Sequence, residues 1–104
     1  MANPITFADL DRLLTSHGFV RNPHPPKFVA YTHPLNENYL FVFPDHELSD
    51  PAGANHVFDV RRHFDWWGFV DSEEWDRWVC RVRFGAECVE TQREQEHAAP
   101  AAAR

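Results

Sequence analysis

Hydrophobic positions recur every three or four residues in three separate stretches of this sequence. Such spacing places the apolar side chains on one face of a helix. The stretches are built on Phe7, Leu10, Leu13 and Leu14, on Val57, Val60, Phe64 and Trp67, and on Trp75, Trp78, Val79 and Val82. N-caps are expected at Thr6, at Asp50 or Asn55, and at Asp71. Gly18 and Gly68 are expected to end the first two helices.

Between the first two helices the pattern changes to strands. Alternating and continuous apolar positions predict strands at residues 28–33 and 39–43, joined by a turn at 34–38. A short strand is expected to begin at residues 19–20. Residues 22–26 contain three prolines, which lack an amide hydrogen, so a stiff loop is expected there. The order predicts an α+β fold: a helix, a three-stranded antiparallel sheet and two C-terminal helices.

The composition fits one domain. The chain has 104 residues, 43% of them hydrophobic, with nine Phe and four Trp. Their side chains are large enough to form a core without disulfides or metal ions as cross-links. A single domain is expected over residues 1–90. Residues 91–104 are rich in Ala, Glu and Gln, and they contain no large apolar side chain from Gln92 on. This segment is expected to be a disordered tail.

The two cysteines and the N-terminal residues suggest a compartment. Cys80 and Cys88 match neither a disulfide framework nor a paired-cysteine zinc pattern, and they are interpreted as free thiols in a reducing compartment. Met1–Phe7 has neither the basic start nor the apolar run of a signal peptide. No stretch approaches the roughly 20 apolar residues of a membrane span. A cytoplasmic protein with no membrane partner is therefore expected.

The charge is unevenly distributed. The net charge of −6 argues against nucleic acid as a partner. However, residues 12–36 contain no acidic side chain, while Arg21 and Lys27 lie among them. Residues 37–50 reverse the sign, with acidic residues and no cation. The first stretch is a candidate for binding a phosphate chain, and chance clustering in a short sequence is the alternative.

Five short motifs occur in a fixed order over roughly residues 6–70. They are a helix ending in Gly-Phe, an arginine in the next strand, an aromatic-x-His-Pro run, a strand closing on Pro and His, and a helix followed by a Gly-hydrophobic pair. In this sequence they are Leu13–Phe19, Arg21, Tyr31–Pro34, Phe41–His46 and Arg61–Phe69. With these motifs, the chain resembles the HicA family of small toxin-like proteins.

The resemblance to HicA carries several expectations. It implies a fold like that of a double-stranded-RNA-binding domain and a metal-independent mRNA endoribonuclease of a toxin–antitoxin system. RNA and an antitoxin-like protein are then the partners, and no cofactor is expected. Arg21 and Lys27 are the candidate phosphate contacts. The resemblance adds His33 and His46, expected at one edge of the sheet, to the RNA-facing surface; strand-end histidines in water are the alternative.

The catalytic position departs from the family pattern. The general acid/base of HicA proteins is a His in a Gly-Ser-His run before the second strand, and that run falls here on Pro26-Lys27-Phe28. RNA cleavage without a metal needs groups that accept and donate protons, which a phenyl ring cannot do. His24, four residues before Phe28, is the candidate substitute, and a solvent-exposed loop histidine is the alternative. Cleavage is therefore expected to be weak or absent.

Two further features have open alternatives. His56, Asp59 and His63 share one helical flank and offer ligands that suit zinc, or they are ordinary residues at the rim of the core. Trp66 cannot share the buried stripe of its neighbour Trp67, so it is either covered by the third helix or exposed as a partner surface.

The sequence thus favours a HicA-like RNA-binding domain with little or no mRNA cleavage. A protein-interaction module without a nucleic-acid role is the alternative, favoured by the acidic charge and by Trp66. The surface around Phe28 distinguishes the two hypotheses. A basic concave surface there supports RNA, and an apolar or acidic one supports a protein partner.

Overall fold

The fold is known from a computed structural model that describes residues 3–88. The element order is α1 (Phe7–Ser16), β1 (Val20–His24), β2 (Phe28–Thr32), β3 (Leu40–Pro44), α2 (Ala54–Trp67), α3 (Ser72–Phe84) and the short 3-10 helix η1 (Gly85–Glu87). This confirms the predicted α+β fold. The expected disordered tail, residues 91–104, lies outside the described residues. Within residues 3–88 no helix is long and apolar enough to cross a membrane.

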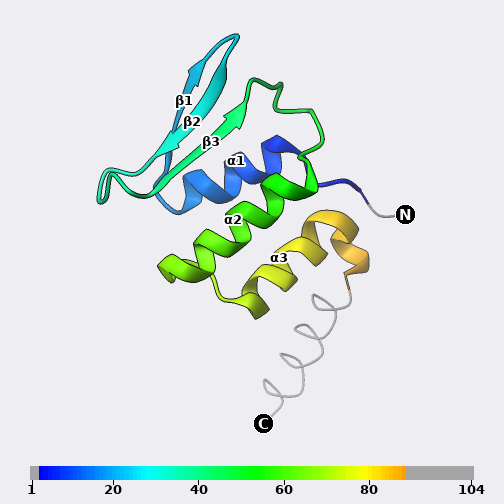
Figure 1. The fold of residues 1–104 in the computed structure, drawn as a ribbon. Helices are drawn as coiled ribbons and strands as arrows, with labels where there is room; N and C mark the ends of the chain where they lie inside the picture. Colours follow the sequence, from blue (N-terminus) through cyan, green and yellow to red (C-terminus); the bar gives the residue numbers. More distant parts are fainter. Residues whose placement is uncertain (1–2, 89–104) are drawn as a thin grey trace.

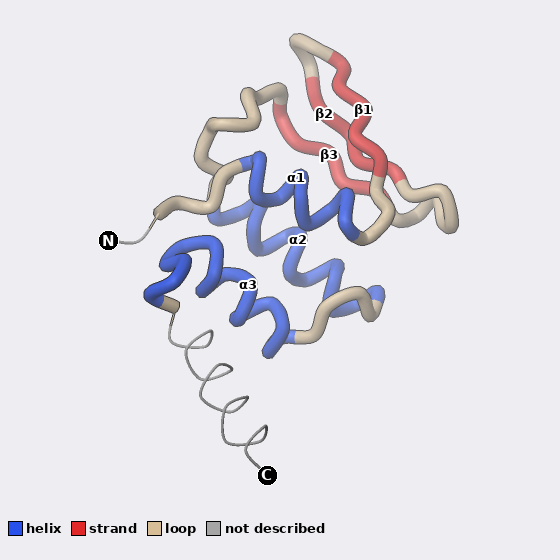
Figure 2. The backbone as a smooth tube through the Cα atoms, turned by 180° about the vertical axis from the view of Figure 1, so that it is seen from behind, coloured by secondary structure: helices blue, strands red, loops and turns tan. Residues whose placement is uncertain are grey.

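The elements form three layers (Figure 1). The three strands make an antiparallel sheet in the order β1-β2-β3. Helices α1 and α2 lie against one face of the sheet, and α3 lies on the side of these helices that is turned away from the strands, as the opposite view in Figure 2 also shows. Among the helices of residues 3–88, none covers the other face of the sheet in either view.

The start of α1 follows from a local signal. The Thr6 hydroxyl accepts from the Asp9 amide at 3.3 Å, and the Asp9 carboxylate accepts from the Thr6 amide at 2.9 Å. This reciprocal pair is a capping box, which satisfies two amides that the helix itself leaves free. The expected cap at Thr6 is confirmed. Gly18, just after the helix, has a φ of +94°, as expected for a residue that ends it.

Gly18 is also in close contact with a histidine ring, which gives a prediction. A Cβ at position 18 would lie 2.9 Å from His33 Nε2, whereas a Cβ at Gly68, with a φ of +79°, would meet nothing within 4 Å. Each Gly→Ala change places alanine in the left-handed region, at a cost on the order of 1–3 kcal/mol. We expect Gly18→Ala to lower the free energy of unfolding measurably more than Gly68→Ala in urea titrations. Equal losses would show that the ring moves aside freely.

The caps of the other helices confirm one expectation and correct another. Asp71 accepts from the Glu74 amide at 2.8 Å, as expected for the N-cap of α3. The expectation of Asp50 or Asn55 as the cap of α2 is wrong, because Gly53 occupies that position without a side-chain bond. Asp50 instead accepts from the Glu47 amide in the preceding loop, and Asn55 lies inside the first turn.

The hairpin of β2 and β3 is confirmed, but the expected loop at residues 22–26 is wrong in part. β1 continues to His24 and pairs with β2 over its whole length, with Pro23 opposite Val29. β1 is an edge strand of the sheet. A proline at an edge can direct its missing amide toward solvent and leave the ladder intact, which is why the prolines permit a strand here. The turn is therefore confined to the residues between His24 and Phe28, with a cis peptide bond between Pro25 and Pro26.

The core lies between the sheet and the helices. Alternate strand residues, Val29 and Tyr31 on β2 and Phe41 and Phe43 on β3, are buried, as the pleat requires. Phe64 of α2 is fully buried at the centre. Its ring centroid lies 5.8 Å from that of Phe19, 6.0 Å from that of Phe41 and 5.3 Å from that of Phe69. These aromatic contacts join the sheet to α2.

The cysteines correct a further expectation. Cys80 and Cys88 are not free thiols, because a disulfide joins them. Gly85, with a φ of +57°, ends α3 and turns the chain back, so that the two Cα atoms come within 5.4 Å of each other. That separation lies in the range of disulfides, and Cys88 is fully buried. A sequence separation of 8 gave no sign of the turn that brings them together.

Candidate functional site

The uncovered side of the sheet is the most distinctive surface of the described chain, and we call it the open sheet face. Because side chains alternate across a strand, every second residue points to this side. The pairing of the strands arranges these residues in three rows. The rows are Val20–Thr32–Leu40, Asn22–Ala30–Val42 and His24–Phe28–Pro44.

The open sheet face is uncharged and largely apolar, with Asn22, Thr32 and His24 as its three polar residues. None of its nine residues carries a formal charge with histidine neutral. Three aliphatic side chains on it are about half exposed: Val20 at 52%, Leu40 at 47% and Val42 at 54%. Scattered apolar residues are normal on a surface, but a contiguous set on one face marks an interaction site. Val20 and Leu40 lie in the row farthest from Phe28, whose own row pairs it with exposed His24 and with Pro44.

His24 lies beside Phe28 on this face. The two residues are direct partners across the β1–β2 hairpin, and their ring centroids are 4.7 Å apart. His24 is exposed, so its nitrogens are accessible to a ligand. The strand that replaces part of the expected loop therefore places His24 beside Phe28.

The two expected phosphate contacts do not join His24 on this face. Arg21 alternates to the helix side, where it is the partner of Tyr31 and interacts with it electrostatically. The Tyr31 hydroxyl donates to Asp11 at 2.7 Å, and burial together with this carboxylate raises the pKa of Tyr31. Lys27 is exposed in the turn between β1 and β2. Of the two expected phosphate contacts, Lys27 is thus the one that lies exposed next to the open sheet face.

His33 has a structural place in the fold. It is 8% exposed, its Nδ1 accepts from the Leu35 amide at 3.1 Å, and its Nε2 lies 2.9 Å from the His17 carbonyl. A nitrogen that accepts carries no hydrogen, so Nε2 holds the proton and donates it to the carbonyl. His33 thereby ties the end of β2 to the end of α1. His17 itself is partly buried, and this desolvation lowers its pKa, against an opposing effect of Glu74.

His46 lies at the opposite end of the sheet from His33. Its ring stacks on Phe7, with centroids 3.7 Å apart, and its Nδ1 is 2.8 Å from the Pro44 carbonyl. β2 ends where β3 begins, so residues that follow the two strands lie at opposite ends of an antiparallel pair. The structure therefore does not bring His33 and His46 to one edge. Their binding to RNA stays a prediction.

The metal hypothesis gains no support from the geometry. His63 Nδ1 lies 2.8 Å from the Asp59 carbonyl and 3.2 Å from its carboxylate. His56 instead contacts the rings of Phe7 and Phe43. Over residues 3–88, no three His, Cys, Asp or Glu side chains come together in a way that could hold a metal ion.

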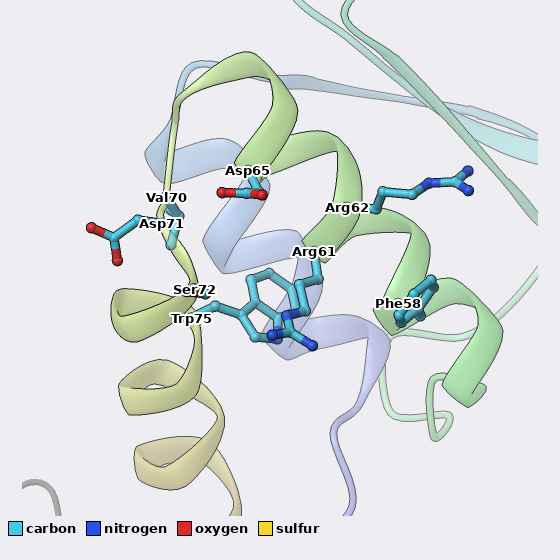
Figure 3. Close-up of a pocket in the computed structure, with 8 residues that line it drawn as sticks. All are labelled: Phe58, Arg61, Arg62, Asp65, Val70, Asp71, Ser72 and Trp75. Carbon is cyan, nitrogen blue, oxygen red and sulfur yellow. The ribbon is translucent and has the colours of Figure 1, made fainter.

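A cavity of about 190 Å³ lies between α2 and α3 (Figure 3). Arg61 and Trp75 extend into the space between the helices, whereas Arg62 points away from α3. Asp65 and Asp71 lie at the rim together with the arginines. The lining carries two arginines and two aspartates, so its formal charges cancel. Trp66, the other candidate from the sequence, is 77% exposed on α2.

One sign of the open sheet face is present in the sequence itself. Residues 39–43 are apolar at every position, whereas a strand with one face in water alternates apolar and polar residues. A continuous apolar run is typical of a strand that is covered on both faces. Here Phe41 and Phe43 are buried, while Leu40 and Val42 on the other face are exposed.

Comparisons of the chain with protein-family models, with curated proteins and with solved structures each give no match. The resemblance to HicA therefore rests on the five sequence motifs alone.

Proposed function

We propose that this chain is a protein-interaction domain whose partner docks on the open sheet face. The observation that carries the proposal is the absence of formal charge from all nine side chains of this face, combined with the exposure of Val20, Leu40 and Val42. Burying apolar surface is the main favourable term of protein association. Nucleic acid, by contrast, is bound through cations that neutralise phosphates, and the face has none.

The proposal is tested by photo-cross-linking in cells. A photoreactive phenylalanine at position 42 points outward from the centre of β3, and the same residue at position 66 replaces exposed Trp66 on α2 as the control. We expect a cross-linked adduct from position 42 that disappears when Leu40→Glu is added. Mass spectrometry then identifies the captured chain. Adducts from position 66 alone would move the interface to α2.

RNA binding of the HicA type is the second candidate. The ring centroid of His24 lies 4.7 Å from that of Phe28, onto which the HicA motif places its catalytic histidine. In this proposal the chain is a HicA-like domain that contacts RNA and an antitoxin-like protein in the cytoplasm. The Cys80–Cys88 disulfide weighs against a cytoplasmic location, because reducing compartments keep thiols reduced.

The expected result for RNA is weak, salt-sensitive binding at most, without cleavage above background. Cleavage needs both a proton acceptor and a proton donor, and His24 is the one histidine among the nine residues of the open sheet face. If RNA binds, Lys27→Glu should weaken it uniformly across sequences and flatten its salt dependence, while Lys27→Arg should preserve it. Fluorescence anisotropy at several salt concentrations measures this. Cleavage that His24→Ala abolishes would contradict the expectation and assign His24 as a catalytic residue.

A further inference from the structure

We infer that the space between α2 and α3 binds a small amphiphilic anion, a molecule with an apolar body and one carboxylate, and that Arg61 holds the carboxylate. This site is separate from the open sheet face, because α3 lies on the side of the helices that is turned away from the strands. A ligand can therefore occupy it whether or not a partner covers the sheet.

The site is a second, larger cavity of about 500 Å³. It shares Phe58, Arg61 and Trp75 with the cavity of Figure 3, so the two are continuous. A volume of this size is typical of sites for small molecules, which hold most of the ligand against apolar side chains and orient it with a few polar groups. The lining has this composition. Its apolar residues include Ile5, Ala52, Val57, Phe58, Trp75 and Val79.

The charged residues of the larger cavity favour an anion. Arg61, Arg83 and Asp76 line it, so its formal charge is positive, although the chain as a whole has a net charge of −6. Asp76 and Arg83 are exposed to water on α3, and the Arg83 guanidinium lies over the ring of Phe84, 5.7 Å from its centroid. Of the three charged residues, Arg61 alone lines both cavities.

Arg61 has the cation that such a ligand needs. Its side chain extends from α2 into the space beside Trp75 (Figure 3), and it is partly buried. Among residues 3–88 this side chain has no hydrogen-bond or ion-pair partner, whereas the neighbouring Arg62 pairs with Asp59 at 3.5 Å. A guanidinium that is partly removed from water without a partner is unfavourable, and a carboxylate can satisfy it with two parallel hydrogen bonds.

These features define the class of ligand. The carboxylate accepts from the Arg61 guanidinium, while an aliphatic or aromatic body packs against Val57, Trp75 and Val79. A neutral amphiphile would fill the apolar part but leave Arg61 without a partner. A nucleic acid strand would need more cations along its phosphates than this cavity supplies.

Titration of the full chain with octanoate, below the concentration at which it forms micelles, tests the site. We expect binding with a dissociation constant on the order of 1 mM, because the probe is small. In amide NMR spectra the signals of Val57, Trp75 and Val79 should shift, while those of Val20 and Val42 on the open sheet face should stay constant. The neutral probe 1-octanol measures what the apolar part of the site contributes alone.

Two variants then separate the charge of Arg61 from the apolar lining. Arg61→Met removes the guanidinium and keeps an apolar side chain, so octanoate should bind at least about tenfold more weakly while the affinity for 1-octanol changes by less than about twofold. Arg62→Met is the matched control, since Arg62 is the next residue on α2 and points away from α3. It should leave the affinity for octanoate unchanged within about twofold.

Thermal unfolding checks that both variants keep the fold, and the shifts in the wild type test the site without any variant. The inference is overturned if octanoate does not bind the wild type at about 10 mM, well above the expected dissociation constant. Equal binding to wild type and folded Arg61→Met overturns it too. Shifts confined to the open sheet face would likewise place the ligand elsewhere and exclude this site.

Discussion

Phe64→Ala is expected to lower the free energy of unfolding by about 3–5 kcal/mol, the range for truncating a buried aromatic side chain. Phe64 is fully buried, and its ring contacts those of Phe19, Phe41 and Phe69. Its removal leaves a cavity at the contact between the sheet and α2. Since domains are stable by roughly 5–15 kcal/mol in total, the variant should retain only part of its stability. Urea unfolding followed by far-UV circular dichroism measures the loss.

The same helix offers a matched control. Phe58 is the same residue type on α2, but it is 58% exposed. Phe58→Ala therefore removes the same atoms without opening a buried cavity, and it should change stability by less than about 1 kcal/mol. Similar losses for the two variants would mean that α2 is oriented differently from the arrangement described above.

Reduction of the Cys80–Cys88 disulfide is expected to destabilise the domain by about 2–3 kcal/mol. The estimate comes from the loop entropy that a cross-link with a sequence separation of 8 removes from the unfolded chain. Without the bond, Cys88 loses its cross-link to α3 and can leave its buried position. Urea unfolding with and without reductant should show the difference, and a thiol assay should detect no free thiol until reductant is added.

The control is the double variant Cys80→Ala with Cys88→Ala. Its stability should equal that of the reduced wild type within about 1 kcal/mol and should not respond to reductant. Reactive thiols in the untreated wild type, measured under denaturing conditions, would restore the original interpretation of two free cysteines.

The sequence predicted best what local interactions determine. The capping box at Thr6, the cap at Asp71 and the glycines that end α1 and α2 each act within a few residues, so the helices were found near their true positions. The antiparallel β2–β3 hairpin was found for the same reason. The strand at Pro23 is not predictable from local sequence, because the effect of a proline depends on whether its strand is central or at an edge of the assembled sheet.

The candidate site depended still more on contacts distant in sequence. His33 looks like any strand-end histidine until Gly18 and the His17 carbonyl are placed beside it. His24 lies opposite Phe28 because β1 continues through Pro23, whereas a loop is expected there from the sequence. The open sheet face could have been suspected from the continuous apolar run at residues 39–43, but its extent depends on the register of all three strands.

The prolines of the sheet have a consequence for assembly in the cell. A three-stranded sheet has two free edges, and each could recruit further strands into an open-ended fibril. Here Pro23 lies within β1 and Pro44 ends β3, so both outer strands carry a residue that cannot donate to a new ladder. The addition of further strands at either edge is thus disfavoured, while the prolines leave the open sheet face accessible to a partner. Edges of this kind disfavour open-ended addition of strands, even though apolar side chains are exposed on the sheet between them.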